Sequence, residues 1–358
     1  MDKIKILVIN PGSTSTKVAV FEDEQLVFVE NIKHEAEELK KFKKITDQFE
    51  FRKNIIENEL KNKGINLNEI KIVMGRGGLL KPIESGVYEV NEQMIKDLQH
   101  SPVGEHASNL GGILAYEIAK NISGAKAYIA DPVVVDEMED MARVAGHPLF
   151  ERKSIFHALN QKAVARTYAK EQGKKYEDLN LIVVHLGGGI SVGAHQKGKV
   201  VDVNQALNGE GPFTPERSGT LPMNQIIDTC FSGKYSKDEI KKMVTGRGGL
   251  VAYLGTNDAY EVEINAQKGD KKSHFYFEAM AYQVAKEIGA LSTVMKGNVD
   301  AIIVTGGIAK SKMFVNWLKE RTSHIAPTAV YPGEDEMRAL ATNGLAVYKG
   351  ELKPKNYQ

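Results

Sequence analysis

The stretch Val8-Ile9-Asn10-Pro11-Gly12-Ser13-Thr14-Ser15-Thr16-Lys17 is the part of this 358-residue chain that best indicates its fold. It follows an apolar, β-branched run over residues 4–9 and leads into a strand pattern over 17–21, and a third strand is expected over 26–30. Glycine lets a backbone approach an anion, while small hydroxyls and consecutive N–H groups donate hydrogen bonds to it. The stretch therefore predicts a β-meander whose first turn binds a phosphate group.

A second copy of this pattern lies about half the chain further on. Residues 181–184 form a strand pattern that leads into His185-Leu186-Gly187-Gly188-Gly189, and more strands are expected over 191–204. From Asn10 to His185 there are 175 positions, and from Asp131 to Thr305, each at the end of an apolar strand, there are 174. The similar offsets predict an internal duplication.

Length and composition fit a globular protein of two domains. A chain of 358 residues is long for one core, and its hydrophobic fraction of 42% and charged fraction of 26% are ordinary. We expect domains over residues 1–150 and 151–336, with a C-terminal helix over 337–358 completing the first. Residues 34–63 predict one or two amphipathic helices whose charges form a solvated face, and 91–121 predicts an interrupted helix.

Charge and cysteine content exclude several classes of protein. The net charge of +1 gives no general attraction to nucleic acid or to an anionic membrane. The single cysteine, Cys230, excludes a disulfide framework and fits a reducing cytoplasm. No apolar run reaches the ~18 residues of a membrane-spanning helix, and residues 3–9 read as a strand rather than as a leader. We therefore expect a cytoplasmic protein with no membrane or nucleic-acid partner.

The glycine turns match neither common nucleotide motif. No G-x-x-x-x-G-K-[ST] sequence is present, and the glycines at 187–189 precede a strand, whereas a dinucleotide fingerprint opens a helix. A third turn, Thr305-Gly306-Gly307, precedes a helical pattern and suits a nucleotide held at a helix N-terminus. Three such turns point to a whole nucleotide rather than to a lone phosphate.

Candidate charged groups stand at strand ends and in loops. Asp131 and the acidic turn at 333–336 could supply carboxylates to Mg²⁺, although the acids of that turn could equally cap the helix that follows. Arg76 and Arg217 have glycine neighbours, and a guanidinium can hold a carboxylate or a transferring phosphoryl group. Arg247 has a similar context, so this local signal is weak. His157 lies in an apolar stretch, where a core histidine is the ordinary explanation.

Five segments, taken together and in order, resemble the acetate and butyrate kinase family of the sugar kinase, Hsp70 and actin superfamily. They are Val8 to Lys17, Asp131-Pro132, Phe156-His157-Ala158-Leu159-Asn160, His185 to Gly189, and Phe213-Thr214-Pro215 with Arg217-Ser218-Gly219. Asn-Pro-Gly-Ser-Thr-Ser-Thr-Lys, His-Leu-Gly-Gly-Gly and Gly-Glu-Asp-Glu-Met are similar to its butyrate kinase branch. The resemblance covers essentially the whole chain. It implies an α/β, duplicated ribonuclease H-like fold of two domains around a central cleft, a first domain on the acyl and phosphoryl side and a second that binds nucleotide.

The resemblance also implies roles for individual residues. Arg76, Asp131, His157 and Arg217 would be catalytic, and Asp131 and Glu336 would hold Mg²⁺. A further set would bind ATP or ADP: Asn10, Gly12, Ser13, Thr14, Ser15, Lys17, His185, Gly187, Gly188, Gly189, Asp258, Gly306 and Gly307. Gly78, Val103, Phe156 and Pro215 would line the acyl pocket. Family analogy favours a homodimer or a higher oligomer.

The implied reaction is reversible phosphoryl transfer from ATP to butanoate, giving ADP and butanoyl phosphate. Acetate-specific relatives carry valine where this chain has Gly78 and a longer loop between Pro215 and Arg217, so extra methylenes are expected to fit. A methylene is worth only about 1 to 3 kcal/mol of discrimination, so isobutanoate, propanoate and pentanoate are expected to react too. The alternatives are an acetate or propionate kinase, a sugar or polyol kinase with Asp131 as base, and an actin-like ATPase.

Overall fold

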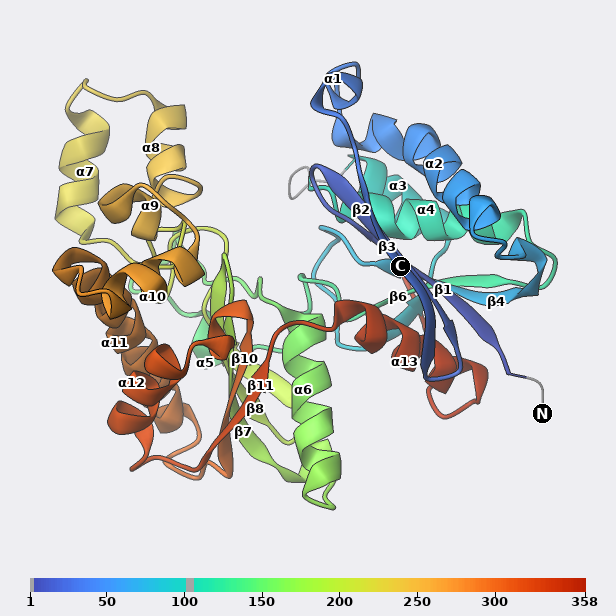
Figure 1. The fold of residues 1–358 in the computed structure, drawn as a ribbon. Coiled ribbons are helices and arrows are strands. Elements are labelled where there is room, and N and C mark those ends of the chain that lie inside the picture. The colour runs from blue at the N-terminus through green and yellow to red at the C-terminus, as the bar shows by residue number, and fades with distance from the viewer. Residues whose placement is uncertain (1–2, 101–105) are drawn as a thin grey trace. The chain divides into compact units, whose positions relative to one another are not determined.

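The computed structural model describes residues 3–100 and 106–358, and they form two compact units. The first unit comprises Met1–Val135 with Asp335–Gln358, and the second comprises Asp136–Glu334 (Figure 1). The expected division lay at residue 150, whereas contacts assign residues 136–150 to the second unit. One such contact is the hydrogen bond from the Glu139 N–H to the Val201 carbonyl, at 3.0 Å.

The first unit is built on a mixed sheet with the strand order β12-β5-β6-β4-β1-β2-β3. The first three strands form the expected antiparallel meander, and β4 and β6 extend it in parallel. Its strands are β1 (Lys5–Pro11), β2 (Ser15–Glu22), β3 (Gln25–Lys33), β4 (Ile70–Arg76), β5 (Val87–Glu89), β6 (Lys126–Ala130) and β12 (Lys355–Asn356). The expected terminal helix ends at Tyr348, and the chain then returns to β12.

Helices cover both faces of this sheet. They are α1 (Ala36–Leu39), α2 (Phe49–Asn62), α3 (Glu92–His100), α4 (Asn109–Lys120) and α13 (Glu336–Tyr348), with short 3-10 turns at Ile45–Gln48 and Leu67–Glu69. A Cβ placed on Gly75 of β4 would meet the Gly111 carbonyl of α4 at 2.1 Å. A Cβ on Gly344 of α13 would instead meet the neighbouring Ile72 and Met74 side chains at 3.0 Å. Because successive strand residues face opposite sides, α4 and α13 lie on opposite faces of β4.

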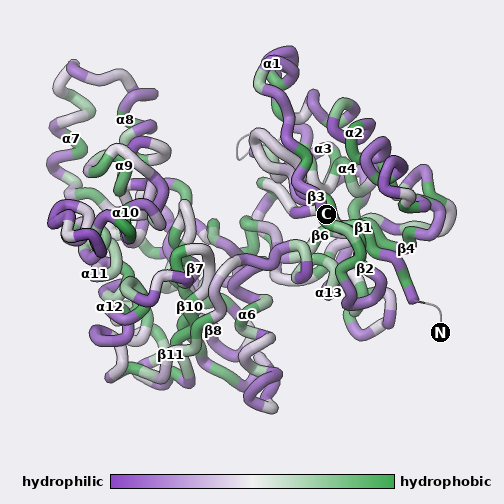
Figure 2. Tube along the Cα trace, in the orientation of Figure 1, coloured by the Kyte–Doolittle hydropathy of each residue, from purple (hydrophilic) through white to green (hydrophobic). Residues whose placement is uncertain are grey.

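The second unit repeats this plan with the strand order β11-β10-β7-β8-β9. Its strands are β7 (Asn180–Leu186), β8 (Ile190–Gln196), β9 (Lys199–Val203), β10 (Ala301–Gly306) and β11 (Thr328–Pro332). The first three form an antiparallel meander, and β10 and β11 extend it in parallel. The inner strands are hydrophobic along nearly their whole length, as Figure 2 shows, because both of their faces are buried.

Helices of the second unit also cover both faces of its sheet. They are α5 (Asp140–Arg143), α6 (Ala158–Glu171), α7 (Met223–Phe231), α8 (Lys237–Val244), α9 (Gly249–Leu254), α10 (Ala259–Gln267), α11 (Lys271–Val294) and α12 (Lys312–Thr322), with 3-10 turns at Tyr176–Asp178 and Gly307–Lys310. Ile182 and Val184 share a core cluster with α11 and α12, whereas Val183 packs with α6. In the described part of the chain no helix is both long and apolar enough to span a membrane.

The two sheets confirm the expected duplicated fold but correct one of its arguments. The hairpins β1–β2 and β7–β8 are equivalent, as the offset of 175 predicts. The offset of 174 compared the ends of β6 and β10, which are not equivalent strands. β4 lies between β6 and the first hairpin, whereas β10 is directly beside the second hairpin. The equivalent pairs are β4 with β10 and β6 with β11. The second half carries α7 to α11 between its meander and β10, so no single offset can hold along the chain.

Candidate active site

Three predicted residues of the first unit meet at one edge of its sheet. Asn10 lies near the end of β1, Arg76 ends β4, and Asp131 directly follows β6. These strands are parallel neighbours, with Ile9 opposite Gly75 and Arg76 opposite Ala130. Carboxyl ends of adjacent parallel strands form the usual ligand site of an open α/β sheet.

Glu336 joins this edge from the start of α13. Its Oε1 lies 2.9 Å from Arg76 Nη2, and its Oε2 accepts a hydrogen bond from Asn10 Nδ2 at 2.7 Å. Arg76 Nη1 also donates to Asn10 Oδ1 at 3.3 Å. Asp335 serves as the cap of α13 instead, accepting from the Arg338 N–H and Nε at 3.0 Å each. Of these two acids, Glu336 is therefore the one at the strand ends.

Asp131 is buried and held in an unusual backbone conformation. Its φ of 38° is rare for a residue with a side chain. Its Oδ1 accepts from Ser85 Oγ at 2.6 Å and from the Gly86 N–H at 2.8 Å, and its own N–H donates to the Gly86 carbonyl. These contacts fix the carboxylate, and strain of this kind is often found at functional positions.

The Asn10 turn is short and closed by one backbone hydrogen bond, from the Gly12 N–H to the Ser15 carbonyl at 2.7 Å. Ser13 and Thr14 at its tip are exposed, while Thr16 is buried. Lys17 lies exposed on β2, paired with Asn10 in the strand register. The tip is thus available to a ligand, and the base of the turn is part of the core.

Predicted residues of the second unit form a cluster around the glycine turn that follows β7. The rings of His157 and His185 stack with centroids 3.8 Å apart. A Cβ on Gly189 would lie 2.2 Å from Arg217 Nη1 and 3.2 Å from His157 Cε1, so the guanidinium packs directly on the glycine backbone. Burial lowers the pKa of Arg217, an effect that the nearby Glu216 carboxylate opposes. The side chain remains a cation at neutral pH.

His185 is buried at the end of β7 and fixed through both ring nitrogens. Its Nδ1 lies 2.8 Å from Asn160 Oδ1, and its Nε2 lies 3.1 Å from Glu334 Oε1. His157 is held in turn by Ser191, whose Oγ lies 2.9 Å from its Nδ1. The two stacked imidazoles therefore have defined orientations beside the turn.

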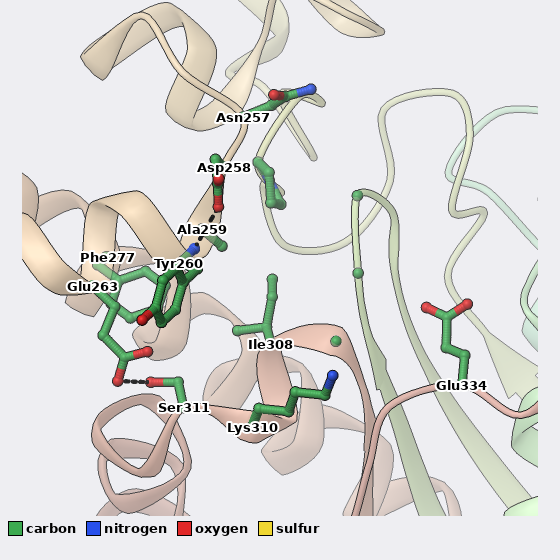
Figure 3. Close-up of a pocket in the computed structure, with 14 residues that line it drawn as sticks. Asn257, Asp258, Ala259, Tyr260, Glu263, Phe277, Ile308, Lys310, Ser311 and Glu334 are labelled. Atoms are coloured by element: carbon green, nitrogen blue, oxygen red, sulfur yellow. Dashed lines mark hydrogen bonds between the residues drawn. The ribbon is translucent and has the colours of Figure 1, made fainter. Parts of the chain in front are cut away.

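A cavity of about 550 Å³ opens next to this cluster (Figure 3). This size is in the range of small-molecule sites. Its lining comprises Gly187, Gly188, Pro215, Asn257, Asp258, Ala259, Tyr260, Glu263, Phe277, Gly307, Ile308, Lys310, Ser311 and Glu334. In Figure 3, Asp258 and Tyr260 lie on one side of the cavity and Glu334 on the other. The cavity combines backbone from two glycine turns with aromatic side chains and a few polar groups.

Local structure explains two predicted residues, Asp258 in the cavity lining and Gly306, the neighbour of the lining residue Gly307. Asp258 caps α10, accepting from the Tyr260 and Glu261 N–H groups at 2.9 and 3.2 Å. Gly306 has a φ of 94°, and a Cβ there would lie 2.3 Å from the Leu186 carbonyl oxygen. Only glycine fits this position without displacing the backbone of β7.

The predicted acyl-pocket residues are less well supported. A Cβ on Gly78 would lie 2.4 Å from Asn109 Oδ1 and 2.5 Å from its Cα, so Asn109 fills the space that was expected for substrate methylenes. Phe156 is buried, and Pro215 lines the cavity of the second unit. Val103 lies outside the described residues. Gly78 therefore gives no extra room at its Cβ position.

The sequence analysis gave no individual role to Ser85, Asn160 or Lys310. Ser85 orients Asp131, Asn160 orients His185 together with Glu334 of the predicted acidic turn, and Lys310 lines the cavity. Asn160 belongs to a quoted motif, but Ser85 and Lys310 have no distinctive local pattern. In the described ranges, no group of three or more His, Cys, Asp or Glu side chains is arranged to bind a metal ion by itself.

Arg52 contradicts the expectation that the charges of residues 34–63 are solvated. It lies in α2 and is completely buried, as are Ile56 and Leu60. The signal was its spacing, since Gln48, Arg52, Ile56 and Leu60 recur every four residues on one helix face. Its guanidinium reaches the base of the Asn10 turn, with Nη1 donating to the Gly12 carbonyl at 2.8 Å.

Comparisons with known proteins agree with this architecture. The chain is similar in fold to an acetate kinase of Porphyromonas gingivalis, with a TM-score of 0.78 and 18% identity over 96% of this chain and 100% of that one. A propionate kinase of Francisella tularensis is similar with a TM-score of 0.74 and 18% identity, over 95% of this chain and 98% of that one. An acetate kinase of Entamoeba histolytica is similar with a TM-score of 0.76 and 16% identity, over 96% of this chain and 100% of that one. A sequence model of the Acetokinase family matches residues 143–325, more than half of the chain, and the protein therefore belongs to the acetokinase family.

Proposed function

We propose that this chain is a carboxylate kinase that transfers a phosphoryl group reversibly between ATP and butanoate. The observation that carries the proposal is the cluster of Asn10, Arg76 and Glu336 beside Asp131 at the strand ends of the first unit. A carboxylate acceptor is already ionised at neutral pH, so the reaction needs no general base. It needs positioning and positive charge, which Arg76, together with Mg²⁺ held by Asp131 and Glu336, would supply at this edge.

In this proposal the arginines handle the anionic groups. Arg76 binds the acyl carboxylate or the phosphoryl group and gives up part of its pairing with Glu336 when it does so. Arg217, packed on Gly189 and close to His157, neutralises charge that develops on the transferred group. Such charge stabilisation is commonly the largest contribution to catalysis in phosphoryl transfer.

Asp131 and Glu336 fit the hard oxygen ligands that Mg²⁺ prefers. This ion usually takes one or two protein carboxylates, and waters and phosphate oxygens complete its shell. Both side chains are oriented by hydrogen bonds, from Ser85 and Gly86 for Asp131 and from Asn10 for Glu336. When bound, the ion would neutralise phosphate oxygens, and the role of these residues is to hold it at the strand ends.

The nucleotide binds the cavity of the second unit in this proposal. Gly187, Gly188, Asp258 and Gly307 all line this cavity. The two former would present backbone to the phosphates, and the two latter would contact the adenosine. The mixture of apolar wall and sparse polar groups suits a nucleoside.

Butanoate as the acid rests on the similarity of Asn10 to Lys17, His185 to Gly189 and Gly333 to Met337 to the butyrate kinase branch, and on the short loop between Pro215 and Arg217. Gly78 adds no support, because Asn109 fills its surroundings. Overlap with isobutanoate, propanoate and pentanoate follows from the small energy of one methylene. The acetate and propionate kinases of similar fold make the shorter acids the principal alternative.

A substrate profile tests the proposal. The purified chain is incubated with ATP, Mg²⁺ and acids of two to six carbons, and acyl phosphate is trapped as the hydroxamate. We expect the highest kcat/KM with butanoate. A maximum at acetate would assign the shorter-acid activity, and ADP formation only with sugars or polyols would overturn the carboxylate assignment. Slow hydrolysis that no small acceptor stimulates would indicate an actin-like ATPase.

The chain also forms a homo-oligomer in this proposal, a dimer or larger. Met223, Ile227 and Phe231 recur every four residues along α7, and their exposed fractions are 70%, 47% and 87%. An exposed apolar stripe of this kind usually marks an interaction surface. Light scattering of Ile227→Lys with Phe231→Lys should show a smaller species than the unmodified chain, with kcat within about threefold because α7 contributes nothing to the cavity lining. An unmodified chain that is monomeric would refute self-association.

A further inference from the structure

A buried guanidinium supports the Asn10 turn from inside the first unit. Arg52 has an exposed fraction of 0%. Its Nη1 donates to the Gly12 carbonyl at 2.8 Å, to the Ser15 carbonyl at 3.1 Å and to Thr16 Oγ1 at 3.0 Å. Its Nη2 donates to the Ser13 carbonyl at 3.2 Å, and Gln48 Oε1 accepts from Nε and Nη2. One side chain thus contacts most residues of the turn.

These contacts occupy the backbone carbonyls of the turn, whereas two of its N–H groups have no backbone acceptor. The carbonyls of Gly12, Ser13 and Ser15 all point to Arg52, and the Thr14 carbonyl accepts from the His34 N–H at 2.9 Å. By contrast, the N–H groups of Ser13 and Thr14 donate to no backbone acceptor in the described chain, and both residues are exposed. A turn whose carbonyls are held from inside and whose exposed N–H groups have no backbone acceptor can serve as an anion-binding nest.

The guanidinium also brings a charge that no acid neutralises. All of its acceptors are carbonyls, an amide oxygen or a hydroxyl, and within residues 3–100 and 106–358 it forms no ion pair with a carboxylate. Burial lowers the pKa of Arg52 to about 10, so it remains a cation at neutral pH. Burial, assisted by this charge, lowers the pKa of His34 to about 4, so His34 is neutral. A buried, unpaired charge is costly to keep, and here it lies directly beneath the turn.

We propose that Arg52 is a positioning residue for phosphoryl transfer, which holds the Asn10 turn open as a nest and adds a positive field beneath it. The inference rests on the proposed function to the extent that the turn faces the transferred phosphoryl group. It goes beyond that function by giving a residue outside the substrate contacts control over the chemical step. Because the nucleotide is assigned to the second unit, the loss of Arg52 changes kcat far more than the KM for ATP.

Three variants separate this role from a purely structural one. Arg52→Met removes the charge and the fork, and Arg52→Lys keeps the charge but has fewer donors. Ile56→Ala is the matched control, since Ile56 is equally buried one turn further along α2 and its truncation destabilises the unit without touching the turn. All are assayed for kcat and both KM values at a temperature where circular dichroism shows them folded.

We expect Arg52→Met to lower kcat about 100-fold with the KM for ATP changed less than about threefold, the size of effect seen when one stabilising donor is lost. Arg52→Lys should recover about a tenth of the normal kcat, and Ile56→Ala should stay within about threefold. Equal kcat losses in Arg52→Met and Ile56→Ala, or a loss confined to the KM for ATP, would overturn the inference.

The failure of the proposed function is detected separately. If the unmodified chain makes no acyl phosphate with any acid, binding of inorganic phosphate is measured by calorimetry on the same proteins. Weaker phosphate binding in Arg52→Met than in Ile56→Ala would then still support the nest. Equal phosphate binding in these two variants would refute it.

Discussion

The two hairpin turns of this protein occupy equivalent places in their sheets but differ in how they are closed and supported. The first is closed by the hydrogen bond from the Gly12 N–H to the Ser15 carbonyl, and the second by that from the Gly187 N–H to the Gly189 carbonyl at 3.0 Å. A buried hydroxyl follows each turn, Thr16 in the first and Ser191 in the second, again 175 positions apart. The duplication thus extends to individual side chains.

Each of these hydroxyls contacts a histidine. Thr16 Oγ1 lies 2.8 Å from His34 Nε2, and Ser191 Oγ lies 2.9 Å from His157 Nδ1. The third partner differs: the Arg52 guanidinium contacts Thr16, whereas Gln161 Nε2 donates to Ser191 Oγ at 2.8 Å. One turn therefore has a cation behind it and the other a neutral amide.

The supporting helices also differ in origin. Arg52 comes from α2, which follows the first hairpin in the chain, and Gln161 comes from α6, which precedes the second. The comparison shows that a duplicated turn acquires a new electrostatic character through the residue behind it, and its closing hydrogen bond and strand register differ as well. In the proposed reaction the charged support lies at the transferred group and the neutral one at the nucleotide.

Removing the arginine beside each turn should give the largest effect. We expect Arg76→Ala and Arg217→Ala each to lose about 10³-fold in kcat, because each removes positive charge from the transferred group. Steady-state kinetics on folded variants test this, with Arg247→Ala as the control arginine from a similar glycine-rich context. Near-normal turnover in Arg76→Ala or Arg217→Ala would remove that residue from the site.

The difference in support can be tested at the second turn. Gln161→Met keeps the side-chain length but removes the donor to Ser191, and we expect a loss of about tenfold in kcat/KM for ATP, smaller than that of Arg52→Met. Leu159→Val is the control: it alters the packing of another buried residue of α6 without removing a hydrogen bond. If Gln161→Met costs as much as Arg52→Met, the charge is not what distinguishes the turns.

The buried His34 beside the first turn should make the stability of the protein depend on pH, which is a smaller effect. The pKa of His34 is about 4 in the folded chain, compared with an ordinary value of 6.5, so the unfolded chain binds more protons between these pH values. The free energy of unfolding should therefore fall as the pH drops from about 6.5 to about 4, with His34 contributing about 1 to 3 kcal/mol.

The measurement for His34 is urea unfolding at pH 7 and pH 5. His34→Gln keeps a polar side chain without the titration, so its pH dependence should be weaker than that of the unmodified chain. Burial also lowers the pKa of His195 in the second unit, and the variant leaves that contribution unchanged. Identical pH dependence in the variant and the unmodified chain would exclude His34 as a source.

Much of the fold and of the site could be predicted from local patterns. The hairpins around Asn10 and His185, and the strand ends at Arg76 and Asp131, follow from alternating apolar runs that stop at glycine or proline. Arg52 could not be placed, because helical spacing identifies a buried face but does not say that a charge on it is satisfied by carbonyls from a distant turn. Gly78 was misinterpreted for a related reason, since Asn109 fills its surroundings from another element.

The C-terminal segment Asp335–Gln358 belongs to the first unit, although the whole second unit separates it from Val135 in the chain. During synthesis, the residues of β1 and β4 that pack on α13 must wait until the whole second unit has emerged. The same is true of Asn10 and Arg76, whose partner Glu336 follows that unit in the chain. A chain that stopped within the second unit would thus lack both a cover for this face and an acid of the proposed site.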